Sequence, residues 1–386
     1  MNKRLIIKNC NIINTTSADD QNADILIEGG EIEDINKGIE SKDCTEIDSE
    51  GRIVVPGFIE VHIQGAGGSD VLDNSKEALE NISKTLARLG TTTYLGTTVV
   101  RPQEDNKHLR LARQHVNKDL GGAKLLGFHL EGPFINPKKK GGLDPNSIYE
   151  PSPKALDEIL DVLGDTLKMM TIAPEVPGNL DLIKLLVKNK VIASFAHSDA
   201  NYEETKAGFE AGISHVTHLF NAMQSLSHRS PGPLGAIFEN EKITAQLISD
   251  GHHLHPSVVN LAYKLLGSER CICITDGMQA MGLPEGKYLY NGREYISKSG
   301  AARYPDGTLI GSTMSLGNIA VKFMEFTKCS FKTAMQTITT NPAKLLGIYD
   351  KKGSVDIGKD ADLVLLDSDY SVYMTIVNGQ IVYKKK

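Results

Sequence analysis

Long apolar runs are missing from this sequence. No segment approaches the roughly 18 consecutive apolar residues that a transmembrane helix needs, so we expect no membrane span. The N-terminal stretch MNKRLIIKNCNIINTT contains only a short apolar run and no small-residue cleavage site, which does not fit a secretory signal peptide. Both absences predict a protein that is neither inserted into a membrane nor exported.

An excess of basic residues is also missing. The 386 residues include 42 Lys and Arg against 48 Asp and Glu, which gives a formal net charge of −6, and both signs are spread along the chain. Because nucleic-acid binding needs a basic face that neutralises phosphates, we expect no nucleic-acid partner. A small anionic substrate is still compatible with this charge, since a single pocket can be basic locally.

Cysteines are few and show no paired spacing. There are five of them, an odd number, and no CxxC occurs. Cys271 and Cys273 lie in the apolar run CICIT, so we expect them to be buried thiols in a reducing compartment. The cysteine pattern therefore predicts a cytoplasmic protein.

The sequence also lacks tandem repeats, low-complexity tracts and a GxGxxG motif after an early strand, so a dinucleotide site is not expected. Its composition of 40% hydrophobic and 23% charged residues is typical of a globular protein with a large core. A chain of this length has room for one large barrel with a smaller module, or for two ordinary domains.

Strand-like patterns occur at both ends of the chain. In residues 1–55, Gly29-Gly30 separates two alternating apolar runs, and in residues 351–386 the pair Asn378-Gly379 does the same. Such pairs are typical of tight hairpin turns. We expect one small β-sandwich built from both termini, with two unrelated terminal hairpins as the alternative.

Residues 56–350 alternate strand-like runs with amphipathic helix patterns. The segment Asn74–Gly90, for example, carries Leu79, Ile82 and Leu86 on one stripe and has a C-terminal glycine. This alternation predicts a parallel sheet, and eight units can close a (β/α)8 TIM-type barrel, with a doubly wound open sheet as the alternative. The eight predicted strands are Phe58–His62, Thr92–Thr97, Leu125–His129, Met169–Ala173, Ile192–Ala196, His215–Thr217, Thr244–Ile248 and Cys271–Thr275.

Polar side chains follow most of these strands, and in a barrel they would meet at the carboxyl face, where active sites of this fold lie. Imidazole and carboxylate groups from different strands suit zinc, iron or another divalent metal, and three protein ligands leave a position open for water. These residues are His62 and Gln64 after the first strand, Glu131 after the third, His197 after the fifth, His218 at the sixth, Asp250 after the seventh and Asp276 after the eighth.

The remaining histidines are expected to have other roles. His215 should point away from the His218 side of its strand and be structural. His108 and His115 lie on a polar helical stretch and are expected to face solvent. Among the clustered residues His252, His253 and His255, no more than two can point at one site.

Several motifs together carry a resemblance to a known family. They are PGFIEVHIQGAGG, HLEGPF, AHSDANY, THLFNAM, DGHH and ITDGM, with the C-terminal run GSVDIGKDADLVLLD. In this order they resemble the N-acetylglucosamine-6-phosphate deacetylase family of the amidohydrolase superfamily. The resemblance runs over nearly the whole chain.

The resemblance implies a metal-bearing barrel with a β-sandwich, usually a homodimer, that hydrolyses the acetamide of N-acetylglucosamine 6-phosphate. It implies one divalent metal, zinc first, with Glu131, His197 and His218 as ligands and Asp276 as the catalytic acid and base. The substrate-binding residues that it implies are Gly142, Asn221, Ala222, Arg229, His253 and the segment Ile310, Gly311 and Ser312. Arg229 would bind the phosphate, in the site of the neighbouring subunit.

Two positions depart from the family pattern. Gln64 stands where many members have the second histidine of an HxH pair, so we expect one metal, with His62 and Gln64 as support or a weak second site. Leu143 stands where a histidine usually contacts the substrate amide. Either another group supplies that contact or the preferred substrate differs. The alternatives are a deacetylase for N-acetylgalactosamine 6-phosphate or another acylated amine, and a barrel that binds sugar phosphates without catalysis.

Overall fold

The computed structural model describes residues 4–15, 21–41, 44–101 and 105–386. Its centre is an eight-stranded parallel sheet in which each strand neighbours the next one along the chain. All eight predicted strands occur, and their observed bounds are β6 (Phe58–Ile63), β9 (Thr91–Thr98), β10 (Lys124–Leu130), β11 (Leu167–Ile172), β12 (Ile192–Phe195), β13 (His215–Val216), β14 (Thr244–Leu247) and β15 (Cys271–Cys273).

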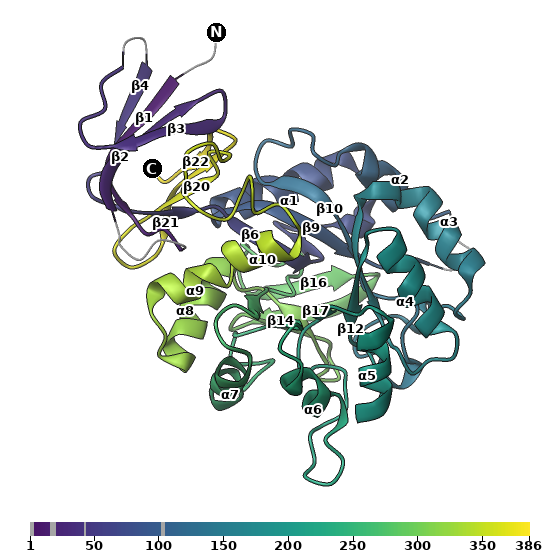
Figure 1. Ribbon diagram of the computed structural model, residues 1–386. Coiled ribbons are helices and arrows are strands. Elements are labelled where there is room, and N and C mark those ends of the chain that lie inside the picture. The colour runs from purple at the N-terminus through teal and green to yellow at the C-terminus, as the bar shows by residue number, and fades with distance from the viewer. Residues whose placement is uncertain (1–3, 16–20, 42–43, 102–104) are drawn as a thin grey trace.

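This sheet curls in the manner of a TIM-type barrel. A parallel bridge between Ile63 and Gly277 links the end of the first strand to the segment after the last one. Helices lie around the outside of the sheet (Figure 1). They are α1 (Lys76–Arg88), α2 (Lys107–Gln114), α3 (Pro153–Leu163), α4 (Asn179–Lys188), α5 (Tyr202–Ala211), α6 (Gly232–Glu239), α7 (Pro256–Leu266), α8 (Leu316–Thr327), α9 (Phe331–Gln336) and α10 (Thr340–Leu345).

Helix α1 illustrates how the sequence pattern becomes packing. Ser75 caps its N-terminus by accepting a hydrogen bond from the backbone of Ala78, and Leu79, Ile82 and Leu86 are buried on the sheet side. Gly90 follows the helix with a φ of +89°, a conformation that favours glycine. The helix predicted from the apolar stripe is therefore confirmed.

Both chain termini contribute to one second sheet, which Figure 1 shows beside the curled sheet. β5 pairs with β1 on one side and with β20 on the other, so the two terminal hairpins belong together. Both two-residue hairpin turns, Gly29-Gly30 and Asn378-Gly379, occur as predicted. The strands are β1 (Arg4–Ile12), β2 (Gln21–Glu28), β3 (Glu31–Asn36), β4 (Cys44–Asp48), β5 (Ile53–Pro56), β20 (Leu363–Leu366), β21 (Val372–Val377) and β22 (Gln380–Lys384).

A four-stranded antiparallel sheet, which the sequence patterns did not reveal, is inserted after β15. It consists of β16 (Gly286–Tyr290), β17 (Arg293–Lys298), β18 (Ala301–Arg303) and β19 (Leu309–Ser312). A second short insertion, the hairpin of β7 (Gly65–Ala66) and β8 (Ser69–Asp70), follows β6. No helix in the described part of the chain is both long and apolar enough to cross a membrane.

One prediction about a histidine is wrong. His108 does not face solvent: its side chain is buried with Leu109 and Ala112, and its Nε2 lies 3.2 Å from the carbonyl oxygen of Val99. The apolar stripe of α2 brings this turn of the helix onto the barrel, and the ring nitrogen finds a backbone partner there. His115, about two turns further, is half-buried. Cys271 and Cys273 are buried free thiols, as predicted.

Candidate functional site

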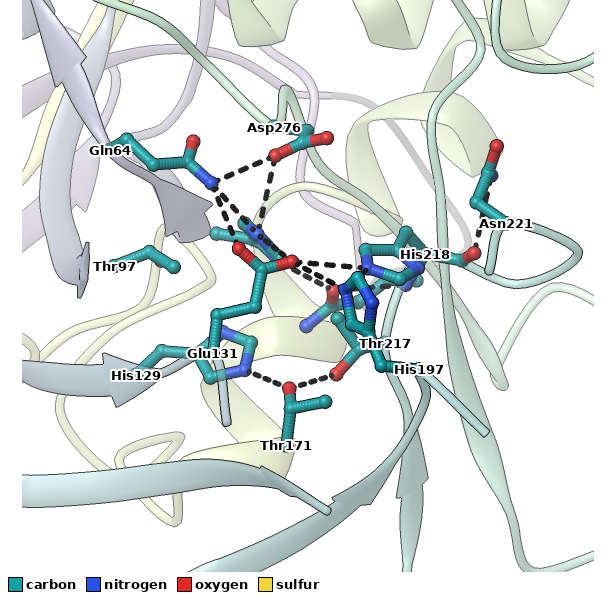
Figure 2. Close-up of polar contacts among 12 residues, drawn as sticks. Gln64, Thr97, His129, Glu131, Thr171, His197, Thr217, His218, Asn221 and Asp276 are labelled. Carbon is teal, nitrogen blue, oxygen red and sulfur yellow. Dashed lines mark hydrogen bonds and ion pairs between the residues drawn. The ribbon is translucent and has the colours of Figure 1, made fainter. Parts of the chain in front are cut away.

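The ends of three barrel strands bring together the predicted metal ligands. One ligand atom from each of Glu131, His197 and His218 lies within 4.8 Å of the others, and all three side chains are buried. Figure 2 shows the two imidazoles facing the carboxylate from one side while Gln64 and Asp276 approach it from the other. The sequence prediction of this cluster agrees with the observed geometry.

The chemistry of the three donors fits a cation. His197 donates from Nδ1 to the carbonyl oxygen of Lys139 at 2.7 Å, which leaves Nε2 of the neutral ring unprotonated. That Nε2 lies 3.1 Å from Nε2 of His218 and 3.1 Å from Oε1 of Glu131, and His218 Nε2 lies 3.2 Å from the same oxygen. Lone pairs that converge in this way repel one another unless a positive charge lies between them. Two imidazoles and a carboxylate are a common ligand set for catalytic zinc and related divalent metals.

The charge state of Glu131 agrees with this arrangement. Burial by itself raises the pKa of a carboxyl group. Here the charge of His62 opposes burial, and the pKa of Glu131 is held well below its ordinary value. Glu131 is therefore a carboxylate at neutral pH, as a metal ligand must be.

Asp276 lies beside this cluster and is also ionised. Burial raises its pKa, but the hydrogen bond and the charge of His62 outweigh burial and lower the pKa below the ordinary value. Its Oδ1 lies 3.3 Å from Nε2 of His62, and its Oδ2 lies 3.6 Å from Nε2 of His253. A carboxylate in this position can accept a proton from a group bound in the cavity.

Gln64 bridges the two carboxylates through its amide group. Its Nε2 donates to Oδ1 of Asp276 at 3.0 Å and to Oε2 of Glu131 at 3.4 Å (Figure 2). His62 donates from Nδ1 to Gln246 at 3.1 Å and is completely buried. The amide thus presents hydrogen atoms, not a lone pair, to the space between Glu131 and Asp276.

The backbone is strained at three of these positions. His197, His218 and Asp276 follow β12, β13 and β15, and each has a positive φ, of 50°, 30° and 50° respectively. For residues other than glycine this conformation costs of the order of 1–3 kcal/mol each, and such residues cluster at functional sites. The strain turns each side chain out of its strand and into the cavity. The periodicity of apolar residues in the sequence does not predict this strained backbone conformation.

Most of the predicted substrate-binding residues line the same cavity as the metal cluster and Asp276. These are Gly142, Asn221, Ala222, His253 and Ile310. Gly311 and Ser312 lie behind the lining: Ser312 donates its backbone N–H to the carbonyl of Asp276 at 2.9 Å. At Gly311 a Cβ atom would lie 2.6 Å from that same carbonyl oxygen, so this contact requires glycine.

Arg229 lies apart from the cavity of its own chain. It is exposed, in the loop that precedes α6, and does not belong to the lining described above. His252 lies with its Nε2 2.8 Å from the carbonyl oxygen of Ser299, and the exposed His255 accepts a hydrogen bond from Ser257. His215 is buried, with Nδ1 2.6 Å from Oγ1 of Thr244, as a structural residue would be.

Two residues that the sequence interpretation missed belong to this site. Glu60 is fully buried, and its carboxylate accepts hydrogen bonds from the backbone of His62 at 2.9 Å and of Thr275 at 3.1 Å. Burial raises the pKa of Glu60 to about 7. The sequence did contain a signal for Glu60, because a carboxylate inside the apolar run PGFIEVHI is unusual. Tyr290, from the inserted sheet, lines the cavity, and only the tertiary structure brings it there.

Comparison with known proteins identifies the family. Residues 53–382 match the amidohydrolase family. The chain is 38% identical over 343 residues to N-acetylglucosamine-6-phosphate deacetylase of Bacillus subtilis (strain 168), covering 86% of this chain and 85% of that one. It is 35% identical over 338 residues to N-acetylgalactosamine-6-phosphate deacetylase of Escherichia coli O157:H7, covering 87% of this chain and 89% of that one.

A solved structure agrees with these relatives. N-acetylglucosamine-6-phosphate deacetylase from Pasteurella multocida superposes with a TM-score of 0.92 at 27% identity, covering 99% of this chain and 100% of that one. The likeness covers nearly the whole chain and therefore includes both the curled sheet and the terminal sheet. This chain therefore belongs to the amidohydrolase family and, within it, to the N-acetylglucosamine-6-phosphate deacetylase family.

Proposed function

We propose that this protein hydrolyses the acetamide group of N-acetylglucosamine 6-phosphate, which yields glucosamine 6-phosphate and acetate. The observation that carries this proposal is the convergence of Glu131, His197, His218 and Asp276 on one cavity. It occurs in a chain that is similar, over most of its length, to relatives named as deacetylases of this substrate. Four side chains suited to amide hydrolysis at one place are the arrangement that the reaction needs.

One divalent metal is the proposed cofactor, with zinc first and iron or another divalent metal as alternatives. Glu131, His197 and His218 would hold it. When bound, such an ion polarises the acyl carbonyl and lowers the pKa of water to about 7. A single ion is favoured because Gln64 directs its N–H groups at Glu131 and Asp276, where a second ion would need lone pairs.

Asp276 is the proposed carrier of the proton. As a carboxylate it accepts a proton from the attacking water, and it returns that proton to the amine nitrogen as the carbon–nitrogen bond breaks. His62 lies within 3.3 Å of the same carboxylate and favours its charged form. The products are a free amine and acetate, so no other reactant is consumed.

Substrate binding is assigned to the rest of the lining. His253, Asn221, Ala222, Gly142 and the 310–312 segment surround the space next to Asp276 and are proposed to hold the sugar.

Arg229 is the proposed phosphate ligand, because its guanidinium can make two parallel charge-assisted hydrogen bonds. Its exposed position outside its own cavity fits a homodimer in which each Arg229 serves the site of the other subunit.

We also propose two structural units: residues 1–55 with 351–386 as a small β-sandwich, and residues 56–350 as the catalytic barrel. The support is a separate apolar core in the terminal sheet. Ile7, Ile25, Val54, Leu363 and Ile376 belong to one cluster that is distinct from the large cluster of the barrel.

A second substrate is N-acetylgalactosamine 6-phosphate. It is favoured by the 35% identical relative named for that sugar and by Leu143, which lines the cavity. The deciding experiment measures acetate released from a panel of N-acetylhexosamine 6-phosphates, with metal content determined on the same preparation. The glucosamine derivative should react fastest. If no member of the panel releases acetate from metal-loaded protein, the deacetylase proposal is wrong and a barrel that binds sugar phosphates without catalysis is the better reading.

A further inference from the structure

Part of the cavity wall combines apolar side chains with one tyrosine. Leu143 packs with Val99 and Ile135, and Tyr290 packs with Met278, Ala280 and other residues of the inserted sheet. Leu72 packs against both groups, so the two form a continuous surface. Leu143, Tyr290 and Ile310 from this surface line the cavity. An acyl methyl group would find apolar contacts here.

Tyr290 differs from the other polar side chains that line the cavity because its polar group is not held by a hydrogen bond within the described residues. Gln64 donates to Asp276 and Glu131, and Asn221 donates to the backbone of residues 218 and 219. His253 is held by Asp250, whose Oδ2 lies 2.7 Å from its Nδ1. Within the described residues the Tyr290 hydroxyl has no hydrogen bond or ion pair, although the residue is only 8% exposed. The hydroxyl oxygen is not sealed inside the protein, so it can bind water or a ligand in the cavity.

The Tyr290 ring is held firmly while its hydroxyl reaches the cavity. Tyr290 ends β16, where it pairs with Arg293 of β17, and its ring is packed within the apolar cluster. Burial raises the pKa of the hydroxyl well above the ordinary value, and the carboxylates of Asp70 and Glu131 raise it further. The group therefore keeps its proton at neutral pH, and as a neutral hydroxyl it can donate a hydrogen bond to an acceptor in the cavity.

We propose that the Tyr290 hydroxyl donates a hydrogen bond to the acyl oxygen of the bound acylated amino sugar, beside an apolar subsite in which Leu143 contacts the acyl methyl group. The inference rests on the proposed function and deepens it, because it names the group that recognises the amide where position 143 offers no donor. A donor aimed at the acyl oxygen gains strength as negative charge develops on that oxygen during attack.

Tyr290→Phe removes the hydroxyl and retains the packed ring. The expected result is a loss of about 10²-fold in kcat for N-acetylglucosamine 6-phosphate, with a smaller change in KM. Tyr295→Phe is the matched control. Tyr295 is a buried tyrosine of the same inserted sheet, but its hydroxyl accepts a hydrogen bond from the backbone of Ala280 at 3.0 Å and lies outside the lining. This control should lose stability and keep the kcat of the folded enzyme. An unchanged kcat in Tyr290→Phe, or equal losses in both variants, would overturn the inference.

Binding measurements separate this inference from the proposed function. Calorimetry with N-acetylglucosamine 6-phosphate and with glucosamine 6-phosphate, carried out on Asp276→Asn protein so that the acylated ligand is not hydrolysed, gives the preference for the acylated ligand with and without Tyr290→Phe. Tyr290→Phe should reduce that preference about tenfold, the equivalent of one hydrogen bond at the upper end of its usual range. If wild-type protein releases no acetate but Tyr290→Phe still lowers the preference, the hydrolytic function fails and the recognition role stands. If protein with Tyr290 intact shows no preference for the acylated ligand, the inference fails.

Discussion

Nδ1 of His253 lies 2.7 Å from Oδ2 of Asp250, and this carboxylate is fixed in place because its other oxygen accepts the backbone N–H groups of residues 252 and 253, each at 2.8 Å. An aspartate held in this way keeps the proton of a neutral His253 ring on Nδ1 and leaves Nε2 as the acceptor that faces the cavity. The pair thus decides which hydrogen bond His253 offers a ligand.

Asp250→Asn is expected to reverse that choice. The Asn amide can still accept the backbone hydrogen bonds, but its NH2 group donates to Nδ1 and so drives the ring proton to Nε2. We expect kcat/KM to fall about 10- to 100-fold, the usual cost of losing a residue that orients a site histidine. Steady-state kinetics of acetate release measures this loss. His252→Gln is the control, because that ring lies outside the lining. Similar values for all three proteins would contradict the role given to Asp250.

Metal removal should abolish activity and lower stability. After chelation, adding zinc at a free concentration a thousandfold above its Kd should restore activity and raise the free energy of unfolding by about 4 kcal/mol. His218→Ala should bind no metal. His215→Asn alters a buried histidine three residues away, which contacts Thr244, and should retain the metal. Elemental analysis should give one ion per chain. Two ions per chain would refute the expectation drawn from Gln64.

Arg229→Ala should raise KM for the phosphorylated sugar far more than for an unphosphorylated analogue, because only the phosphate uses the guanidinium. If Arg229 serves the partner's site, mixing Arg229→Ala subunits with Asp276→Asn subunits should restore activity. Each mixed dimer then contains one site with Asp276 and a partner arginine. If Arg229→Ala raises KM equally for both substrates, Arg229 does not bind the phosphate. No recovery on mixing, with subunit exchange verified, would place Arg229 in its own chain's site or outside both.

Lys352 should be important for stability. It is buried, and its ammonium group lies 2.5 Å from Oδ2 of Asp362 and 2.8 Å from Oδ2 of Asp360, just before β20. Lys352→Met leaves the buried Asp362 without its counter-ion, and we expect a loss of about 3–5 kcal/mol in urea unfolding. The neighbour Lys351 forms an exposed pair with Glu31, so Lys351→Met should change stability by less than about 1 kcal/mol. Equal effects would mean that the buried ion pairs of Lys352 contribute no more to stability than the exposed pair of Lys351.

The sequence by itself determined the order of the barrel strands and the convergence of Glu131, His197 and His218. Apolar runs ending in His or Glu, such as those before Glu131 and His197, fix both the strand and the residue that follows it. In a parallel sheet all such ends meet on one face, so the local pattern is enough to bring them together. The hairpins at Gly29-Gly30 and Asn378-Gly379 could also be predicted from the sequence, because the residues that favour a tight turn are adjacent in the chain.

Only the tertiary structure decided which other groups reach the cavity. Tyr290 comes from an inserted sheet that packs against Leu72, a contact between segments far apart in the chain. The apolar stripe that buries His108 was not recognised in the sequence because charged residues surround it. The positive φ of His197, His218 and Asp276 is imposed by the surrounding fold. Local sequence patterns show which residues are buried. The direction in which a side chain points across a cavity depends on packing between distant segments, and such packing produces no periodic pattern in the sequence.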